Sequence, residues 1–287
     1  MADNDSLAEQ FEEKRGHLRG VAYRMLGSLA EADDAVQEAW LRLSRSGGSS
    51  VDNLGAWLTT VVARVCLDML RSRKSRREDT LDVEQTGRVP SSNDPEQELL
   101  LANSVGLALL VILDTLEPAE RLAFVLHDMF AMPFDEIAEV VGRSIDATRQ
   151  LASRARRRIQ GSPAPQADRS RQREIVDAYL AAAREGNFDA LMSLLDPNIV
   201  LRADRRALGR GGPAEIRGAA VIAERAVKGG ARAAQPVLID GEVGVVVAPR
   251  GRLLMVLKFT VADGKIVEME AIADRDRLRQ LDLAVLG

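Results

Sequence analysis

The sequence predicts a multidomain protein, with two all-α domains followed by an α+β domain. Three observations support this fold class. From Leu7 to about Arg77, apolar residues recur at the spacing of three and four that is typical of helices. A later helical stretch contains a corner at Gly142-Arg143-Ser144 that is too tight for anything but a helix–turn–helix. Beyond residue 199 the pattern changes to short β-branched runs, and Asp263-Gly264 is typical of a tight hairpin turn.

Length and composition set the first limits. The chain has 287 residues, more than one typical domain, and 46% of them are hydrophobic, so it can form more than one core. The formal net charge is −4, yet basic residues gather between Arg64 and Arg77 and between Arg149 and Arg158. Such local patches favour phosphate binding more than the overall charge does.

Cysteine and histidine are too few for several classes of site. Cys66 is the only cysteine, and with two histidines it supplies neither a disulfide framework nor a zinc site of the usual composition. We expect no metal and no cofactor. The acidic N-terminus does not resemble a signal peptide, and no apolar run approaches the roughly 20 residues that span a bilayer. We therefore expect a cytoplasmic protein without membrane contact.

The first domain is expected over residues 1–80. Three apolar stripes predict three helices: Phe11 to Leu26, Ala35 to Leu43, and Trp57 to Leu70. Gly27-Ser28 and residues 47–50 are the predicted breaks. Residues 81–98 are rich in Thr, Gly, Pro and Ser, which predicts a flexible linker, because so few apolar residues cannot offset the entropy of ordering.

The second domain is expected over residues 99–160 and contains the helix–turn–helix. Gly142 can adopt the left-handed conformation that ends the first helix, and Ser144 can cap the second. In the second helix Ala147, Leu151, Ala155 and Ile159 point inward. Its outward side suits a DNA major groove, although a surface hairpin with solvated arginines is the alternative. The outward residues are Arg149, Gln150, Ser153 and Arg154.

The third domain is expected over residues 171–287, after a linker at residues 161–170. An amphipathic helix from Ile175 to Ala183 stops near Gly186, and a short second helix precedes Pro197. Five β-branched segments follow, which predicts helices packed on one curved antiparallel sheet. The expected strands are residues 199–201, 236–239, 243–248, 253–261 and 265–272.

The first domain carries two candidate surfaces. Asp34, Gln37, Glu38 and Leu41 share one helical side, which suits a basic partner helix but is also common in solvated faces. Trp57 opens the third helix and offers either a stacking plane for an unpaired base or a side chain for the core. The cationic end of the same helix offers phosphate contacts.

Together these motifs, in this order, resemble an extracytoplasmic-function sigma factor of bacterial RNA polymerase over residues 7–160. The resemblance implies a region-2 domain that binds the β′ clamp helices and opens the −10 element of promoter DNA. It also implies a region-4 domain that reads the −35 element and meets the β flap. Asp34, Gln37, Glu38 and Leu41 would then contact the clamp, and Arg149, Gln150, Ser153 and Arg154 the −35 groove. Asn53, Trp57 and Arg64 would handle the melted −10 strand, while Arg71, Arg73 and Lys74 would hold its phosphates.

Residues 171–287 resemble the SnoaL-like (NTF2-like) domain that is fused to one class of these sigma factors, and Glu185 to Val200 fits its opening helices and first strand. The resemblance implies a cone-shaped fold that regulates the sigma domains in cis. Ala203 to Ala207 and Ala273 to Leu278 depart from the family's motifs, and residues 81–98 lack its Trp-Leu-Pro-Glu-type motif. The candidate intramolecular contacts are Arg202, Arg205, Arg206, Arg210 and a closing helix from Arg275 to Leu286.

The same fold also hosts isomerases and cyclases, so an enzyme is one alternative and a ligand-sensing helix–turn–helix regulator is another. The third domain has no histidine and no clear acid–base pair, so we expect no catalysis. A small-molecule ligand in the cone, acting as a signal, stays open. The candidate acids or bases are Asp204, Asp240, Glu242, Asp263, Glu268 and Glu270.

Overall fold

The computed structural model describes residues 2–46, 53–79, 106–161, 166–207, 214–229 and 231–286. The predicted linker at 81–98, the helix start at Leu99 and Arg210 lie outside these ranges. The chain divides into two units, the first formed by Met1–Gly106 with Leu116–Arg156 and the second by Leu107–Thr115 with Arg157–Gly287. In the described ranges, no helix combines the length and apolar character needed to cross a membrane.

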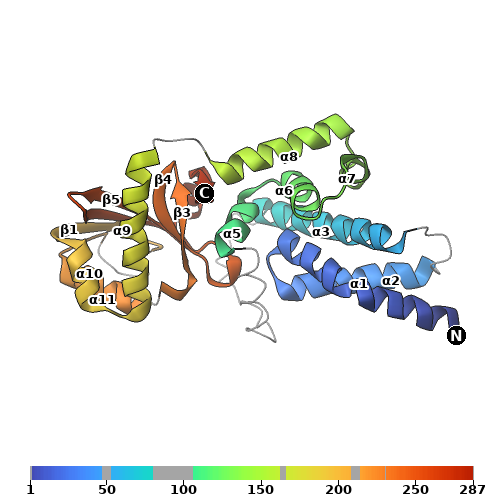
Figure 1. The fold of residues 1–287 in the computed structure, drawn as a ribbon, viewed down its shortest axis with the longest axis horizontal. Coiled ribbons are helices and arrows are strands. Elements are labelled where there is room, and N and C mark those ends of the chain that lie inside the picture. The colour runs from blue at the N-terminus through green and yellow to red at the C-terminus, as the bar shows by residue number, and fades with distance from the viewer. Residues whose placement is uncertain are drawn as a thin grey trace. The chain divides into compact units, whose positions relative to one another are not determined.

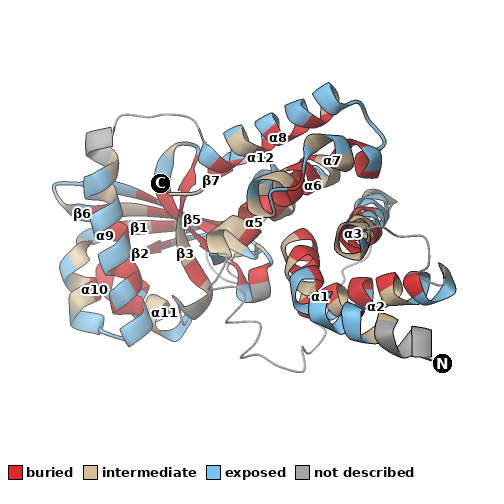
Figure 2. Cartoon of the chain, turned by 45° about the vertical axis from the view of Figure 1, so that its right-hand side comes forward, coloured by how far each residue is buried: buried red, intermediate tan, exposed pale blue. Residues whose placement is uncertain are grey.

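Three helices open the first unit and pack on one another as a bundle: α1 (Ala2–Leu26), α2 (Leu29–Ser46) and α3 (Leu54–Asp79). Their buried faces turn toward one another, as the red surfaces in Figure 2 show. Leu18, Leu43 and Leu58 are fully buried there. The predicted break at Gly27 is confirmed, because α1 ends where this glycine takes a φ of 72°.

The remaining elements of the first unit form the helix–turn–helix and its support: α6 (Pro118–Phe124), the π-helical turn η1 (Val125–Met129), α7 (Phe134–Val141) and most of α8 (Ile145–Gln160). Both α6 and α7 pack against α3 of the bundle. The two halves of this unit are therefore in direct contact.

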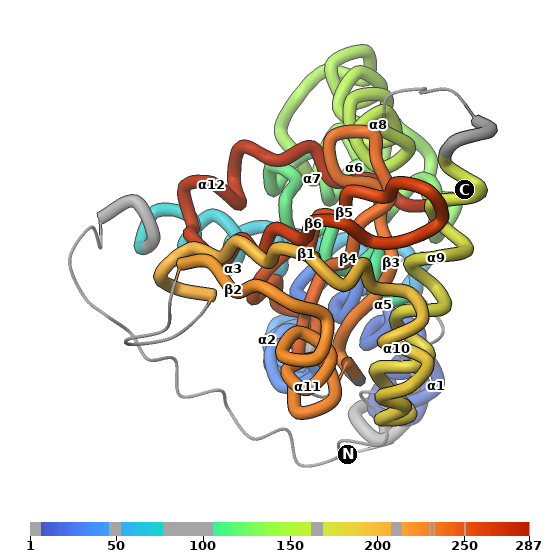
Figure 3. Tube along the Cα trace, turned by 90° about the vertical axis from the view of Figure 1, so that its left-hand side faces the viewer, coloured from blue at the N-terminus to red at the C-terminus, as the bar shows by residue number. Residues whose placement is uncertain are grey.

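The second unit is built on a seven-stranded sheet with the order β2-β1-β6-β5-β4-β3-β7; several of its strands run side by side in Figure 3. The Asp263-Gly264 hairpin is confirmed, since both residues have positive φ (51° and 77°). The expectation of a purely antiparallel sheet is wrong, because β1 and β6 pair in parallel. A long connection through β2, a helix and three strands lets β6 return in the direction of β1. The strands are β1 (Leu195–Ala203), β2 (Glu215–Arg217), β3 (Ala234–Ile239), β4 (Glu242–Val247), β5 (Met255–Ala262), β6 (Lys265–Ile272) and β7 (Leu283–Ala284).

Helices pack on this sheet as Figure 1 shows. The sheet contacts α9 (Gln166–Glu185), α10 (Phe188–Leu194) and α11 (Ala219–Gly229), whose apolar side chains form one core with it. The apolar helix α5 (Leu107–Thr115) packs against β3 and the short turn η3 (Pro249–Gly251). A further short turn, η2 (Ala231–Ala233), precedes β3.

The end of the chain differs from the prediction. The expected closing helix to Leu286 is wrong, because α12 spans only Arg275–Gln280 and is followed by β7. Asp274 caps α12 by accepting backbone N–H bonds from Asp276 and Arg277. Burial of Leu283 and Ala284 against the edge strand β3 explains why the chain leaves the helix to add a strand.

Candidate nucleic-acid and polymerase interface

Two local features that the sequence predicts define the turn of the helix–turn–helix. Gly142 ends α7 in the left-handed conformation and donates its N–H to the Ala138 carbonyl at 2.9 Å. The Ser144 hydroxyl then accepts the backbone N–H of Ala147 at 3.2 Å and so caps α8. Leu151 and Ala155 are buried, which fixes the opposite side of α8 as the outward one.

All four predicted groove residues are exposed on that outward side: Arg149, Gln150, Ser153 and Arg154. Arg149 pairs with Asp146, one turn earlier, at 3.0 Å. Arg154 donates from Nε to a carboxylate oxygen of Glu120 on α6 at 2.8 Å. Glu120 is buried, so this pair ties the second half of α8 to its supporting helix. The side chain of Arg154 stays 47% exposed beside this contact.

On α2, the predicted polymerase-binding residues also share one side. Asp34, Gln37 and Leu41 are exposed, and the half-buried Glu38 accepts from Arg42 at 2.9 Å. Leu41 is 42% exposed, which is unusual for a leucine in an otherwise well-buried bundle. The face therefore combines negative charge with an apolar contact point, which suits a partner helix that is both basic and apolar.

The start of α3 carries the residues assigned to the melted strand. The Asn53 side chain accepts the backbone N–H of Ala56 at 3.1 Å and caps the helix. Trp57 is half-buried, so its ring both packs on the bundle and keeps an exposed part. Arg64 and Arg71 lie exposed further along α3, with two turns between them.

Three of the cationic side chains assigned to the −10 strand and its phosphates already have partners inside the first unit. The Arg64 guanidinium donates to the Glu139 carbonyl of α7 at 3.4 Å, and Lys74 pairs with Glu117, just before α6, at 2.7 Å. Arg73 donates to the Leu26 carbonyl at 3.2 Å and pairs with Glu31 on α2. The same cationic groups that suit DNA thus hold α3 to neighbouring elements.

A buried arginine joins the two halves of this unit, and sequence reasoning missed it. Arg121 on α6 is only 2% exposed, and its Nε and Nη2 donate to the Arg24 carbonyl of α1 at 3.2 and 3.1 Å. It reaches α1 beside Gly27, where that helix ends and its last carbonyls lack helical donors. Nothing in the sequence signals this role, because an arginine on a short helix is ordinarily solvated.

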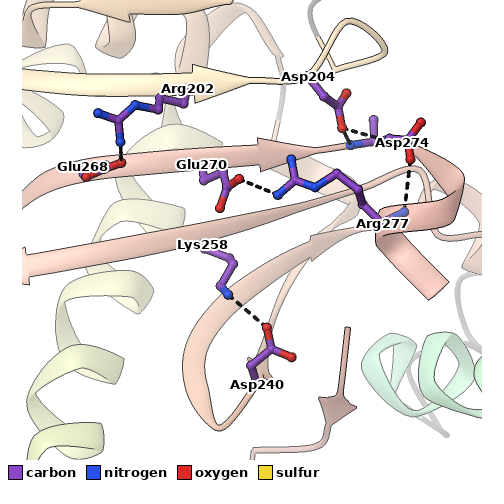
Figure 4. A network of polar contacts seen from close by, with 9 residues as sticks. Arg202, Asp204, Asp240, Lys258, Glu268, Glu270, Asp274 and Arg277 are labelled. Atoms are coloured by element: carbon purple, nitrogen blue, oxygen red, sulfur yellow. Dashed lines mark hydrogen bonds and ion pairs between the residues drawn. The ribbon is translucent and has the colours of Figure 1, made fainter. Parts of the chain in front are cut away.

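The candidate acids of the second unit are engaged in its own scaffold (Figure 4). Asp204 accepts four backbone N–H groups that join the end of β1 to the end of β6. Burial alone would raise the pKa of Asp204, but these hydrogen bonds, with that from Asp274 the largest, hold it below its ordinary value. Burial would likewise raise the pKa of Asp240, and the Asp282 N–H and Lys258 lower it.

Ion pairs on the sheet hold two further candidates. Arg202 pairs with Glu268 on the neighbouring strand, and Arg277 pairs with Glu270 at 2.6 Å. Two arginine-bearing segments that were expected to contact the sigma domains thus make contacts within their own unit. Glu242 and Asp263 are exposed at turns. In the described part of the chain, none of the six candidate acids lines the cavity between the helices and the sheet.

Two protein-family models match this chain. The model of Sigma-70 region 2 matches residues 11–76, and that of Sigma-70 region 4 matches residues 106–159. The extracytoplasmic-function RNA polymerase sigma factor SigJ of Mycobacterium tuberculosis is 37% identical over 290 residues, with 93% of this chain and 92% of the relative covered. The chain belongs to the extracytoplasmic-function sigma factors.

Solved structures extend the comparison to the third domain. The crystal structure of M. tuberculosis SigJ covers 94% of this chain and 98% of its own at 33% identity, with a TM-score of 0.46. An NTF2-like protein of unknown function from Cytophaga hutchinsonii covers 37% of this chain and 93% of its own at 15% identity, with a TM-score of 0.27. This sigma factor has helical sigma domains and a C-terminal domain of helices packed on a mixed sheet, and it directs RNA polymerase to promoters to initiate transcription. Its family consists of sigma factors, which are not enzymes.

Proposed function

We propose that this sigma factor contacts polymerase and promoter, in the cytoplasm, through the surfaces on α2, α3 and α8. Asp34, Gln37, Glu38 and Leu41 would dock on the β′ clamp helices, because they combine acidic, amide and apolar groups on one exposed side. The region-4 domain would meet the β flap. Asn53, Trp57 and Arg64 would handle the melted −10 strand and Arg71, Arg73 and Lys74 its phosphates, while Arg149, Gln150, Ser153 and Arg154 would read the −35 groove.

The proposal extends to control of these surfaces within the chain. The supporting observation is that two cationic side chains of α3 contact region 4. Lys74 pairs with Glu117, just before α6, and Arg64 donates to the Glu139 carbonyl of α7. Buried Arg121 closes the same contact on α1. Region 2 and region 4 would then have to separate before α3 can receive a melted DNA strand. The contact between them is a closed, inactive state in this proposal.

The C-terminal domain would act on region 4 by holding both ends of it. At one end α5, the first helix of the region-4 segment, packs on β3 and η3, and Leu110 to Leu113 are buried. At the other end, the Val285 N–H donates to the Ile159 carbonyl of α8 at 2.8 Å. Arg158 of α8 donates to the Thr115 carbonyl of α5 at 3.1 Å, which joins these two ends of region 4 to each other. A domain that holds both ends can restrain where the helix–turn–helix goes.

Run-off transcription with purified core polymerase tests both parts. Full-length protein is compared with a chain truncated after Gly161, on a library of promoters, alongside direct measurement of affinity for core polymerase. We expect the truncation to change affinity or promoter output, because α5 and the end of α8 lose their partner domain. Equal affinity and output in both proteins would refute the regulatory proposal and leave the sigma assignment standing. Unchanged −10 and −35 footprints after substitution of the assigned residues would refute the contact assignment.

A further inference from the structure

The second unit encloses a cavity that none of its assigned roles uses. The cavity has a volume of about 240 Å³ and lies between α9, α11 and the sheet. It exists because small side chains line it where larger ones would fill it, among them Ala183 on α9, Ala226 on α11 and Ala271 on β6. Apolar cavities of about 150 Å³ already accept benzene, so this one is large enough for a ligand.

Among the described residues that line the cavity, Tyr179 and Arg225 carry polar side chains. Tyr179 is 5% exposed, and its ring is held edge-on to Phe259 at 5.4 Å between centroids. Among the described residues its hydroxyl has no hydrogen-bond partner. Burial raises the pKa of this hydroxyl to about 12, so it stays a neutral donor. An oxygen acceptor in the cavity would therefore find an unpaired donor in this hydroxyl.

Arg225 supplies charge at the edge of the same cavity. It is exposed on α11, and in the described part of the chain no carboxylate pairs with it. The neighbouring rim is fixed in advance, because Arg184 of α9 donates to the carbonyls of Ala231 and Ala234, at 3.4 and 2.6 Å. A preformed rim lowers the ordering cost of binding.

We infer that this cavity binds a small apolar carboxylic acid that carries one further oxygen acceptor. Its carboxylate would lie at Arg225, its hydrocarbon part among the alanines and its second oxygen at the Tyr179 hydroxyl. The lining residues that the structure describes include no carboxylate, histidine, cysteine or serine, so this part of the site is suited to holding a molecule rather than converting it. A signalling role for the ligand rests on the proposed control by this domain, whereas binding itself does not.

Calorimetric titration of the full-length protein tests the site with three probes: ω-hydroxydecanoate, decanoate and decanol. We expect ω-hydroxydecanoate to bind one per chain and most tightly, since it alone offers both polar groups. Tyr179→Phe should weaken ω-hydroxydecanoate roughly two- to tenfold and leave decanoate unchanged. Arg225→Gln should weaken both acids and spare decanol.

Matched variants separate the cavity from other surfaces. Ala183→Leu and Ala226→Leu fill the cavity with residues that helices favour, and either should abolish binding of all three probes. Arg217→Gln, at an exposed arginine outside the cavity, should change nothing, and thermal unfolding checks that each variant is folded. No binding of any probe to the unaltered protein, or undiminished binding to a folded cavity-filling variant, would overturn the inference. Because no polymerase is present, the result is independent of whether the regulatory proposal holds.

Discussion

Replacement of Arg121 by methionine should release region 4 from region 2. The side chain is 2% exposed, and its two nitrogens share one acceptor, the Arg24 carbonyl. A hydrogen bond from a charged donor contributes about 1.5–3 kcal/mol. Methionine keeps an unbranched apolar stem, so little packing is lost, and it removes the desolvation cost of a buried guanidinium. The lower part of the range is therefore the better expectation, about 1.5 kcal/mol, which is roughly a tenfold shift toward the open state.

The consequence is measurable with core polymerase. When the binding-competent state is a minor fraction, the apparent dissociation constant is the intrinsic one divided by that fraction. A tenfold larger open fraction should thus tighten binding of full-length Arg121→Met to core polymerase by roughly tenfold. Hydrogen exchange of the α3 backbone should rise in the free protein, because α6 and α7 cover that helix less of the time.

The matched control is Arg19→Met, which removes an arginine pair inside region 2. Arg19 on α1 pairs with Asp33 on α2 at 2.8 Å, inside the three-helix bundle, so its loss should leave the closure contacts and polymerase affinity unchanged. If Arg121→Met and Arg19→Met both bind core polymerase as the unaltered protein does, with unchanged exchange in α3, the reasoning about closure is wrong.

Four further outcomes can be measured directly. Arg149→Ala and Arg154→Ala should each weaken binding to the −35 element by about 1–3 kcal/mol if the side chain reaches a base edge. Unchanged −35 footprints would contradict this prediction. Arg157→Ala should instead lower the slope of log binding constant against log salt concentration by about one, if Arg157 contacts one phosphate. Gly142→Ala should lower the free energy of unfolding by about 1–2 kcal/mol, because φ at this position is 72°. No atom lies within 4 Å of the added Cβ, so the expected cost is conformational and not steric. Unchanged thermal unfolding would contradict this prediction. The lowered pKa of Asp204 contributes stability that is present above the ordinary aspartate pKa and is lost as pH falls through the folded value; Asp204→Asn should remove this part of the acid-side slope in unfolding measured against pH.

The helices of the first unit and the hairpin of the second could be predicted because they depend on neighbours in sequence. Gly142 and Ser144 act within one turn of their helices, and Asp263-Gly264 closes a two-residue loop. The outward face of α8 follows from the same helical period that buries Leu151. Local physics was sufficient for each of these elements.

Elements that depend on residues far away along the chain were not predicted from the sequence. The strand β7 is only Leu283–Ala284, and it exists because β3 offers an open edge. The helix α11 and strand β2 carry weak local signals, and parallel pairing of β1 with β6 is decided by the whole topology. Arg121 is the clearest case, because its burial depends on a carbonyl 97 residues away. Such contacts cannot be read from period or composition.

The cationic side chains of α3 connect the proposed closed state with promoter binding. Lys74 and Arg64 on α3 each meet an acceptor of region 4, Glu117 and the Glu139 carbonyl. An N–H of Lys74 that donates to Glu117 cannot donate to a phosphate at the same time. In the proposed closed state, promoter DNA and region 4 would therefore compete for the same cations of α3. Each exposed pair contributes only about 0.2–1 kcal/mol, so in this proposal polymerase and DNA can displace the pairs one by one. Buried Arg121 contributes more to the free energy of separating the two regions.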